Sequence, residues 1–320
     1  MKKIATLLMV MLGLSLISYF LWNYNLNKGL EFVKKGNYEN AIQNFRMACK
    51  YKNKNGCIEL GKAYFYMGDN EENITKIKSF FELASIYNNT LAYTGLGDIY
   101  FKEKNYNKSL EYYTKACNAN NAKGCVAVGA IYLNGIGVEI DETKATKFYN
   151  QACQLGDNMG CTALANRYYN GDGVRIDYNK SSKLFTKACD NNNIVACEKL
   201  GNMYNQGEGV KQDIFEAIRL YKIACNNNFY SSCTTLGAIY FQGKDNLSKN
   251  YQLSEKYFSK SCSEDIGLAC FGLGGLYVSM MNFSKAGIFY QKACDLKVEN
   301  ACQLKNYTDT LSRMSNYLYP

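Results

Sequence analysis

Fourteen cysteines dominate the chemistry that this chain of 320 residues could support, and they form seven pairs with one spacing. The two members of every pair are eight positions apart, and successive pairs recur after 68, 36, 36, 36, 37 and 32 residues. The pairs are Cys49/Cys57, Cys117/Cys125, Cys153/Cys161, Cys189/Cys197, Cys225/Cys233, Cys262/Cys270 and Cys294/Cys302. A fixed period with a fixed internal spacing predicts one structural unit that is repeated along the chain.

Cysteines at such positions serve either as disulfide partners or as metal ligands, and the spacing favours disulfides. An even count without a leftover thiol suits an oxidising compartment. Structural zinc sites need closer ligands, such as Cys-x2-Cys, and the chain contains no such pair. We therefore expect one disulfide in each pair, no metal site and no cofactor.

The 68-residue interval contains one repeat without cysteines. Ser85 and Tyr93 occupy the two positions where the pair should be. Because this junction lacks the covalent bond that the other junctions share, we expect it to be the weakest point of the array.

Residues for several common catalytic mechanisms are absent. The chain contains no histidine, which excludes Ser-His-Asp triads, Cys-His pairs and histidine-ligated zinc. The serine β-lactamase motifs Ser-x-x-Lys, Ser-Asp-Asn and Lys-Thr-Gly are absent as well. The net charge of +9 is spread along the chain, so the charge pattern favours a solvated face over a nucleic-acid surface.

Three Gly-x-Gly-Val segments, such as Gly207 to Val210, look like phosphate-binding loops only superficially. No strand is predicted before them and no Gly-Lys-Ser/Thr follows them, as a phosphate-binding loop requires. Glycines that end a helix and adopt positive φ angles explain these segments better.

Each repeat is predicted to form two helices. The first contains a glycine and, three residues later, an aromatic residue, as in Gly201 and Tyr204, and one copy has Ala165 with Tyr168 instead. The second contains alanine, an aromatic residue and alanine at spacings of four and three, as in Ala217, Tyr221 and Ala224. These spacings place the small and aromatic side chains on one face of each helix. We expect eight hairpins over residues 25–301 and a C-terminal capping helix with a tail at residues 302–320.

The amino terminus has the order of an export signal. Lys2 and Lys3 precede an uncharged, mostly apolar run of 19 residues from Ile4 to Trp22. This run is also long enough to cross a bilayer, and no Ala-x-Ala cleavage site follows it. We expect residues 1–24 to be either a signal peptide or an N-terminal membrane anchor. Either would make the protein secreted or periplasmic, in the second case tethered to the inner membrane.

Motifs within the sixth repeat carry a family resemblance. The segment from Leu200 to Tyr204, the Gly207–Val210 turn and the stretch from Ala217 to Cys225 resemble Sel1-like repeats, relatives of the tetratricopeptide repeat. With its evenly spaced cysteines, the chain resembles the Helicobacter cysteine-rich proteins over most of its length. This resemblance implies an all-α, right-handed α/α superhelical solenoid with disulfides between its hairpins. It also implies penicillin binding and weak β-lactamase activity, although no catalytic residue can be named in this sequence.

In tetratricopeptide-like stacks the first helices line a concave groove, and its positions can be counted from the Leu-Gly-x-x-Tyr motif. This count places the most polar groove positions in the fifth and sixth repeats: Thr162, Asn166, Tyr169, Glu198, Asn202 and Asn205. Asparagines on successive helices can pair with a peptide backbone, because each amide offers donors and acceptors. Ordinary solvated side chains are the alternative explanation.

The main functional hypothesis is an exported solenoid that binds peptides or protein partners in this groove, such as peptidoglycan peptide or host proteins. The alternative is a weak β-lactamase or penicillin-binding protein that hydrolyses penicillin and cephalosporin derivatives. A third hypothesis is a structural scaffold that captures only large partners. Nucleic acid is not an expected partner, and membrane contact is expected only through the N-terminal segment. Asn73, in Glu-Glu-Asn-Ile-Thr, fits an acceptor for bacterial N-glycosylation.

Overall fold

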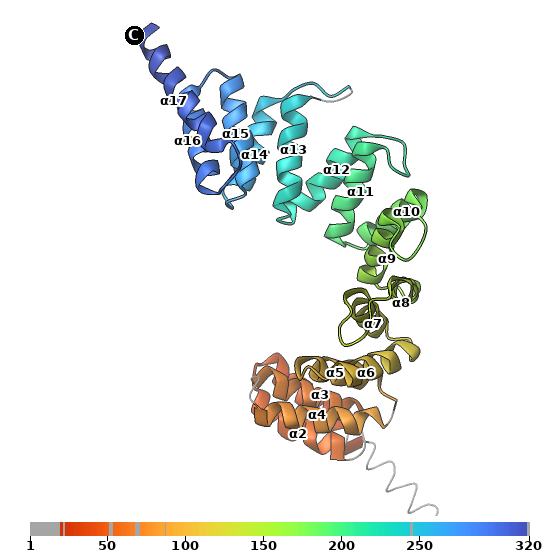
Figure 1. Ribbon diagram of the computed structural model, residues 1–320. Coiled ribbons are helices and arrows are strands. Elements are labelled where there is room, and N and C mark those ends of the chain that lie inside the picture. Colours follow the sequence, from red (N-terminus) through yellow and green to blue (C-terminus); the bar gives the residue numbers. More distant parts are fainter. Residues whose placement is uncertain are drawn as a thin grey trace, which may run out of the picture. The chain divides into compact units, whose positions relative to one another are not determined.

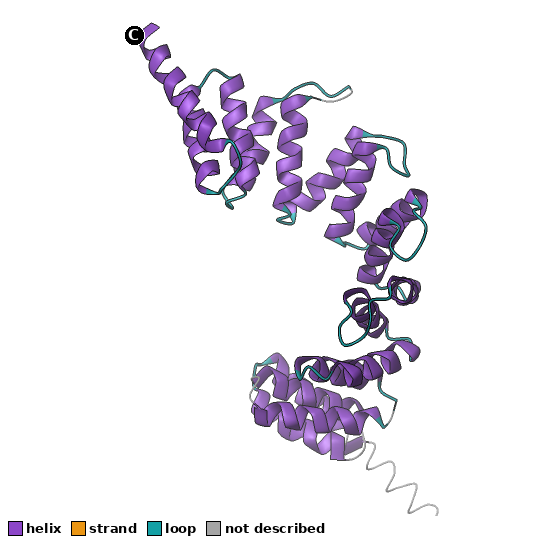
Figure 2. Ribbon diagram, in the orientation of Figure 1, coloured by secondary structure: helices purple, strands orange, loops and turns teal. Residues whose placement is uncertain are grey.

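The computed structural model describes residues 20–21, 23–50, 54–67, 71–86, 88–243 and 246–318. Throughout these residues the chain forms helices joined by turns and loops, and none of them lies in a strand (Figure 2). The helices are α2 (Tyr38–Lys50), α3 (Lys54–Met67), α4 (Glu71–Ser85), α5 (Thr90–Lys102), α6 (Tyr106–Asn118), α7 (Ala122–Asn134), α8 (Glu142–Gln154), α9 (Asn158–Asn170), α10 (Tyr178–Asp190), α11 (Ile194–Gln206), α12 (Ile214–Asn226), α13 (Tyr230–Gln242), α14 (Tyr251–Cys262), α15 (Gly267–Ser279), α16 (Phe283–Asp295) and α17 (Ala301–Leu318). The all-α prediction is confirmed.

Consecutive helices pack against each other in hairpins, with the odd-numbered helix first and the even-numbered helix second (Figure 1). The chain divides into two compact units, Met1–Gly160 and Cys161–Pro320, and each unit is a stack of such hairpins. The predicted export segment at residues 1–24 lies mostly outside the described residues, and so does the side chain of Asn73. Within the described chain, no helix is both long enough and apolar enough to cross a bilayer.

Disulfides close the turns between successive hairpins. The bridges with described geometry are Cys49–Cys57, Cys117–Cys125, Cys189–Cys197, Cys225–Cys233, Cys262–Cys270 and Cys294–Cys302. Their Cα atoms lie 4.6 Å apart in the first pair and 4.9 Å apart in Cys225–Cys233. Cys153 and Cys161 are disulfide-bonded too, so no cysteine is free. Closing so short a loop stabilises the fold by about 2.5 kcal/mol in the chain-entropy model.

The constant spacing of the cysteines follows from the turn that they span. After α6, Asn120 adopts a left-handed conformation with φ of 62°. Asn121 then caps α7 by accepting a hydrogen bond from the Gly124 N–H at 3.1 Å. Asparagine tolerates the left-handed region and is a good N-cap, so two small polar residues reverse the chain. The second cysteine therefore always falls in the first turn of the next helix.

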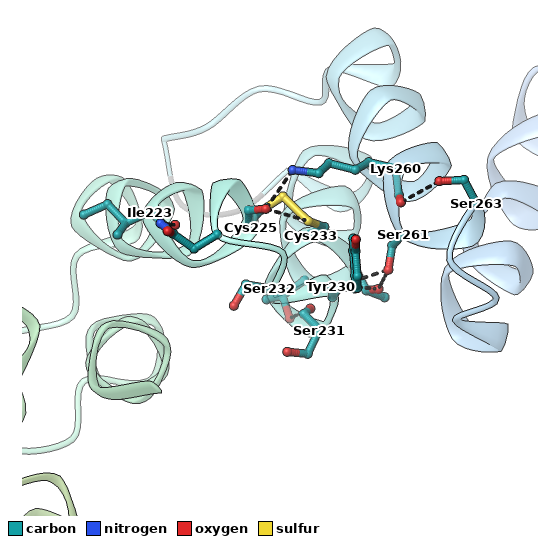
Figure 3. The surroundings of a disulfide bond; sticks show 12 residues. Ile223, Cys225, Tyr230, Ser231, Ser232, Cys233, Lys260, Ser261 and Ser263 are labelled. Carbon is teal, nitrogen blue, oxygen red and sulfur yellow. Dashed lines mark hydrogen bonds between the residues drawn. A yellow bond between two sulfur atoms is a disulfide. The ribbon is translucent and has the colours of Figure 1, made fainter. Parts of the chain in front are cut away.

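A side chain from the following hairpin covers the carbonyl group of the first cysteine. Lys260 of α14 donates to the Cys225 oxygen at 2.7 Å, beside the Cys225–Cys233 bridge (Figure 3). Lys292 of α16 donates to the Cys262 oxygen at 2.9 Å in the same way. Carbonyl groups at a helix C-terminus lack intrahelical partners and carry negative partial charge, so a lysine there stabilises the junction.

Within most hairpins, an aromatic ring of the second helix packs on a glycine of the first, whereas α9 has Ala165 at this position. A Cβ atom at Gly97 would lie 2.5 Å from the Tyr113 ring. The equivalent distance is 2.6 Å between Gly237 and the Phe258 ring. Real Cβ atoms do not approach rings this closely, so only glycine permits the two helices to pack at this spacing.

The Gly-x-Gly-Val turns are structural, as the sequence predicts. Gly207 has φ of 78° and ends α11 in the left-handed conformation. Gly209 has φ of 65° and packs directly against Tyr178 at the start of α10. The first glycine therefore ends the helix, and the second lets the loop approach the preceding hairpin.

At the junction without cysteines, a tyrosine hydroxyl takes the place of the disulfide. The Tyr93 hydroxyl donates to the Ser85 carbonyl oxygen at 3.2 Å and lies 2.9 Å from Asn88 Oδ1. Such hydrogen bonds contribute about 1 kcal/mol each, which is less than a covalent bridge contributes. The prediction that this junction is the weakest in the array remains untested, and these contacts agree with it.

Two adjacent glycines of α15 allow a matched test of the hairpin contact. In Gly274→Ala the new Cβ would lie 2.6 Å from the Tyr290 ring, so we expect a loss of about 1–3 kcal/mol. In Gly275→Ala the closest atom would be the Tyr290 hydroxyl oxygen at 3.7 Å, so helix propensity should give a gain of about 0.5–1 kcal/mol. Thermal unfolding of both variants measures the difference. Equal midpoints would contradict the packing account.

Hydrogen exchange can test the unbridged junction. We expect amides of α4 and α5 to exchange before those at any bridged junction, and Tyr93→Phe to increase their exchange further by removing about 1 kcal/mol. Tyr132→Phe is the control, because the Tyr132 ring stacks on Phe148 and no hydrogen bond of its hydroxyl is described. Uniform protection along the oxidised chain would show that this junction is not a weak point.

Candidate binding cleft

A polar cleft lies between α9 and α11 in the second unit, Cys161–Pro320. Its volume is about 340 Å³, and its walls are Asn166, Tyr169, Asn170, Lys199, Asn202 and Gln206. The floor is the ring of Phe185 from α10, which is only 1% exposed. An apolar floor beneath amide-rich walls is the arrangement of many small binding sites.

Helical periodicity explains why these walls are continuous. On α9, Asn166, Tyr169 and Asn170 follow the spacing of three and four residues that marks one helix face. On α11, Lys199 and Asn202 are three residues apart, and Gln206 lies one turn further along. Each helix therefore presents one polar face to the cleft.

The amide of Asn202 is oriented by a buried tyrosine. The Tyr221 hydroxyl, from α12, donates to Asn202 Oδ1 at 2.7 Å. Burial, followed by the negative charge of Glu198, raises the pKa of Tyr221, so the hydroxyl remains a donor. Because the oxygen of Asn202 is occupied, its NH2 group is left to donate to a ligand.

A second tyrosine belongs to the wall itself. The Tyr169 hydroxyl donates to Glu208 Oε2 at 2.6 Å, and its ring contacts the Tyr178 ring edge-to-face at 5.3 Å. The hydrogen bond to Glu208, together with burial, raises the pKa of Tyr169 to about 12. Tyr169 therefore stays neutral at physiological pH, and its position is fixed from two sides.

On the first helices of the second unit, one cation has no ion-pair partner among the described residues. The sequences of α9, α11, α13 and α15 contain only three charged residues: Arg167, Glu198 and Lys199. Arg167 pairs with Asp172 at 3.0 Å, and Glu198 accepts hydrogen bonds from Ser231 and Ser232. Lys199 is exposed, and no carboxylate pairs with it among the described residues. The cleft thus offers amide donors and one cation, which suits a ligand rich in carbonyl or carboxylate oxygens.

The structure brings together three of the six residues that the sequence predicts for the groove: Asn166, Tyr169 and Asn202. Thr162, Glu198 and Asn205 do not line the cleft. Thr162 is only 7% exposed, whereas the sequence predicts an exposed position.

The side chain after the bridged cysteine is held by hydroxyl groups of other helices, which explains part of this difference. Glu198 Oε1 accepts a hydrogen bond from Ser232 of α13, in the next hairpin, at 3.1 Å. Thr234, the equivalent residue of the next repeat, lies 2.7 Å from the Ser261 hydroxyl of α14, in its own hairpin. Glu198 and Thr234 are therefore bound to other helices of the stack.

Sequence reasoning missed Asn170, Phe185, Lys199 and Gln206. Asn170, Lys199 and Gln206 each directly follow a residue that was predicted, namely Tyr169, Glu198 and Asn205. The cleft-facing side of these helices therefore extends one residue beyond the predicted positions. Lys199 was the available signal, because it is one of only two cations in the sequences of α9, α11, α13 and α15.

The Tyr169–Glu208 contact predicts a specific pH dependence. Because the pKa of Tyr169 in the fold, about 12, is above its ordinary value of 10.0, the hydrogen bond is complete below pH 10 and is lost as pH rises through 12. Carbon NMR of protein that contains isotope-labelled tyrosine measures this titration, and the Tyr169→Phe variant assigns the signal. In Glu208→Gln the pKa should return towards 10.0. An unchanged titration in that variant would rule out Glu208 as the cause.

Comparison with known proteins agrees with this architecture. The Sel1 repeat model matches residues 122–157, 158–193, 194–229, 231–265 and 266–298, together more than half of the chain. The tetratricopeptide repeat model matches residues 23–55 and 91–123. The Helicobacter pylori protein named "Putative beta-lactamase HcpE" is 42% identical over 50 residues, or 16% of this chain and 14% of HcpE.

Two solved structures share the fold. The c5321 antigen of uropathogenic Escherichia coli superposes with a TM-score of 0.77 at 24% identity, over 88% of this chain and 62% of that protein. A Sel1 repeat protein of Oxalobacter formigenes gives 0.65 at 22% identity, over 75% of this chain and 99% of that protein. At these identities the likeness concerns the fold alone. With five matched repeats over more than half of its length, this chain belongs to the Sel1 repeat family.

Proposed function

We propose that this protein binds extended peptide segments of partner proteins in the cleft between α9 and α11. Sel1 and tetratricopeptide-like repeats typically mediate protein–protein interactions, so a binding role is the starting point. The observation that carries the proposal is the orientation of the Asn202 amide by Tyr221, since its oxygen is occupied at 2.7 Å and its donors are free.

The remaining cleft residues complement a peptide backbone. Asn166 donates through Nδ2 to the Thr162 carbonyl at 3.1 Å, which leaves its Oδ1 to accept a peptide N–H. Asn202 then donates to a peptide carbonyl from the facing helix, and the exposed Lys199 pairs with an acidic side chain or a C-terminal carboxylate. The buried ring of Phe185 provides an apolar floor for one ligand side chain.

The disulfides support a place of action outside the cytosol. Fourteen bonded cysteines without a free thiol are typical of proteins that mature in an oxidising compartment. Peptides of the cell wall or of host proteins are the partners that such a protein would meet. The bridges would preserve the cleft there, because each one restricts the unfolded chain.

The name of HcpE raises β-lactam hydrolysis as a second function. The matched stretch covers only 14% of HcpE, and this chain contains none of the serine β-lactamase motifs. The cleft between α9 and α11 likewise has no serine or cysteine nucleophile on its walls. We therefore expect binding without turnover when the oxidised protein is incubated with a chromogenic cephalosporin. Turnover that disappears in Asn202→Ala would replace the binding proposal with an enzymatic one.

Selection from a random peptide phage library tests the proposal directly. We expect the oxidised parent protein to enrich a set of peptides and Asn166→Ala/Asn202→Ala to lose at least tenfold in affinity for them, because each lost hydrogen bond contributes about 1 kcal/mol or more. Lys199→Gln should weaken preferentially the peptides that carry a carboxylate.

Asn134→Ala/Asn227→Ala is the matched control, because both asparagines are exposed and each donates only to the carbonyl four residues earlier on its own helix. It should bind the selected peptides as the parent does. Equal binding by the cleft variant would show that the peptides bind elsewhere. No enrichment at all would favour a scaffold that recognises only large folded partners.

A further inference from the structure

Positive charge gathers on the second helices of the second unit, although the sequence suggests that it is scattered. In α10, α12, α14 and α16 the basic residues are Lys180, Lys183, Lys187, Arg219, Lys222, Lys256, Lys260, Lys285 and Lys292, against four acidic residues. The first helices α9, α11, α13 and α15 contain only Arg167 and Lys199 as cations. The hairpin stack therefore has one nearly uncharged side and one basic side.

The basic residues converge at the seam between α12 and α14. Lys256 lies over the ring of Tyr257, with its Nζ 5.9 Å from the ring centroid. Lys222, from α12, acts on the same tyrosine, because its positive charge opposes the burial that raises the pKa of Tyr257. Lys260 extends from α14 to the Cys225 carbonyl at the end of α12 (Figure 3). Three lysines from two helices thus surround one short segment of surface.

The carboxylates around this seam are bound to other groups. Glu216 holds Arg219, with a distance of 2.8 Å between Oε2 and Nε, and Asp190 acts electrostatically on the same guanidinium. Glu255 accepts a hydrogen bond from the hydroxyl of Tyr277 on α15. Among the described side chains, none of the three lysines forms an ion pair with a carboxylate. The helices α12 and α14 together contain four basic and two acidic residues, so the seam has a net positive charge, which attracts anions.

An apolar side chain stands on the same helix face. Phe215, Arg219 and Lys222 are spaced by four and three residues on α12, so they point to one side. Phe215 is 57% exposed and does not belong to the buried core of this part of the stack. An exposed aromatic beside lysines is the composition of surfaces that lie against a bilayer, where the ring enters the headgroup region and the lysines meet anionic lipids.

We propose that the seam formed by Lys222, Lys256 and Lys260, with Phe215 beside it, docks on an anionic phospholipid surface. Two kinds of polyanion could occupy this seam, namely a phospholipid surface and a nucleic acid. Nucleic acid would supply the same negative charge, but a protein with fourteen bonded cysteines matures where nucleic acid is scarce. The docked solenoid would keep its uncharged first helices, including the cleft between α9 and α11, available to a peptide.

Vesicle sedimentation with the full-length protein tests this proposal. The readout is the ratio of partition into phosphatidylglycerol/phosphatidylcholine vesicles to partition into pure phosphatidylcholine, compared between variants that all have the same N-terminal run. For the parent this ratio should be large and should fall with added salt. In Lys222→Gln/Lys256→Gln it should fall about thirtyfold, since each lysine near an anionic surface contributes about a fivefold gain. Phe215→Ser should lower partition without changing the salt dependence.

Lys104→Gln/Lys123→Gln provides the matched control, because it removes two exposed lysines outside the seam. Its ratio should equal that of the parent, and the melting temperatures of all variants should agree. Equal vesicle binding by the seam variant and the parent would overturn the proposal. Lysine-dependent binding of inorganic phosphate or duplex DNA, with no preference for anionic vesicles, would overturn it in favour of a free anion or a nucleic acid.

Discussion

A covalent bond across a very short turn is the constraint on which this solenoid depends. The turn between α6 and α7 consists of a helix end, the left-handed residue Asn120 and the N-cap Asn121. A disulfide then ties the last turn of one helix to the first turn of the next. In a stack where each hairpin contacts only its neighbours, the angle between repeats is set locally. Within each unit, a bridged turn therefore restricts the relation of one hairpin to the next.

The bridge is reinforced by contacts that extend to the following repeat. Lys260 and Lys292 each donate to the carbonyl of a bridged cysteine in the hairpin before. In the repeat without cysteines, the hydroxyl of Tyr93 has this role. Covalent, charged and neutral links thus occur at equivalent places, and the strength of a junction is set by which of them the sequence supplies.

The two helices of a hairpin have different tasks, and this division produces the two candidate surfaces. The first helix contains the glycine on which the aromatic ring of the second helix packs, and its outer residues are mostly small or amide side chains. The second helix supplies the ring and, in the second unit, most of the charges. A ligand that needs hydrogen bonds from amides can therefore bind to the first helices. An anionic surface that needs cations can bind to the second helices of the same hairpins.

The sequence by itself determined the period, the disulfide-bonded cysteines and the hairpins, because each depends on spacing within one repeat. The Gly-x-Gly-Val turns were also predicted correctly, since positive φ angles at Gly207 and Gly209 are a local property. The cleft was predicted only in part. Asn166 and Asn202 line it, but Glu198 turns to Ser232 of the next hairpin.

Only the tertiary structure decided which side chains are free to bind a ligand. Tyr221 comes from a different helix than Asn202 and fixes which end of that amide is available. Contacts between helices also produce the basic seam. Lys222 and Lys256 are 34 positions apart in the chain, but both act on Tyr257. Spacing along a chain fixes the face of one helix, whereas the contacts between helices fix what that face meets.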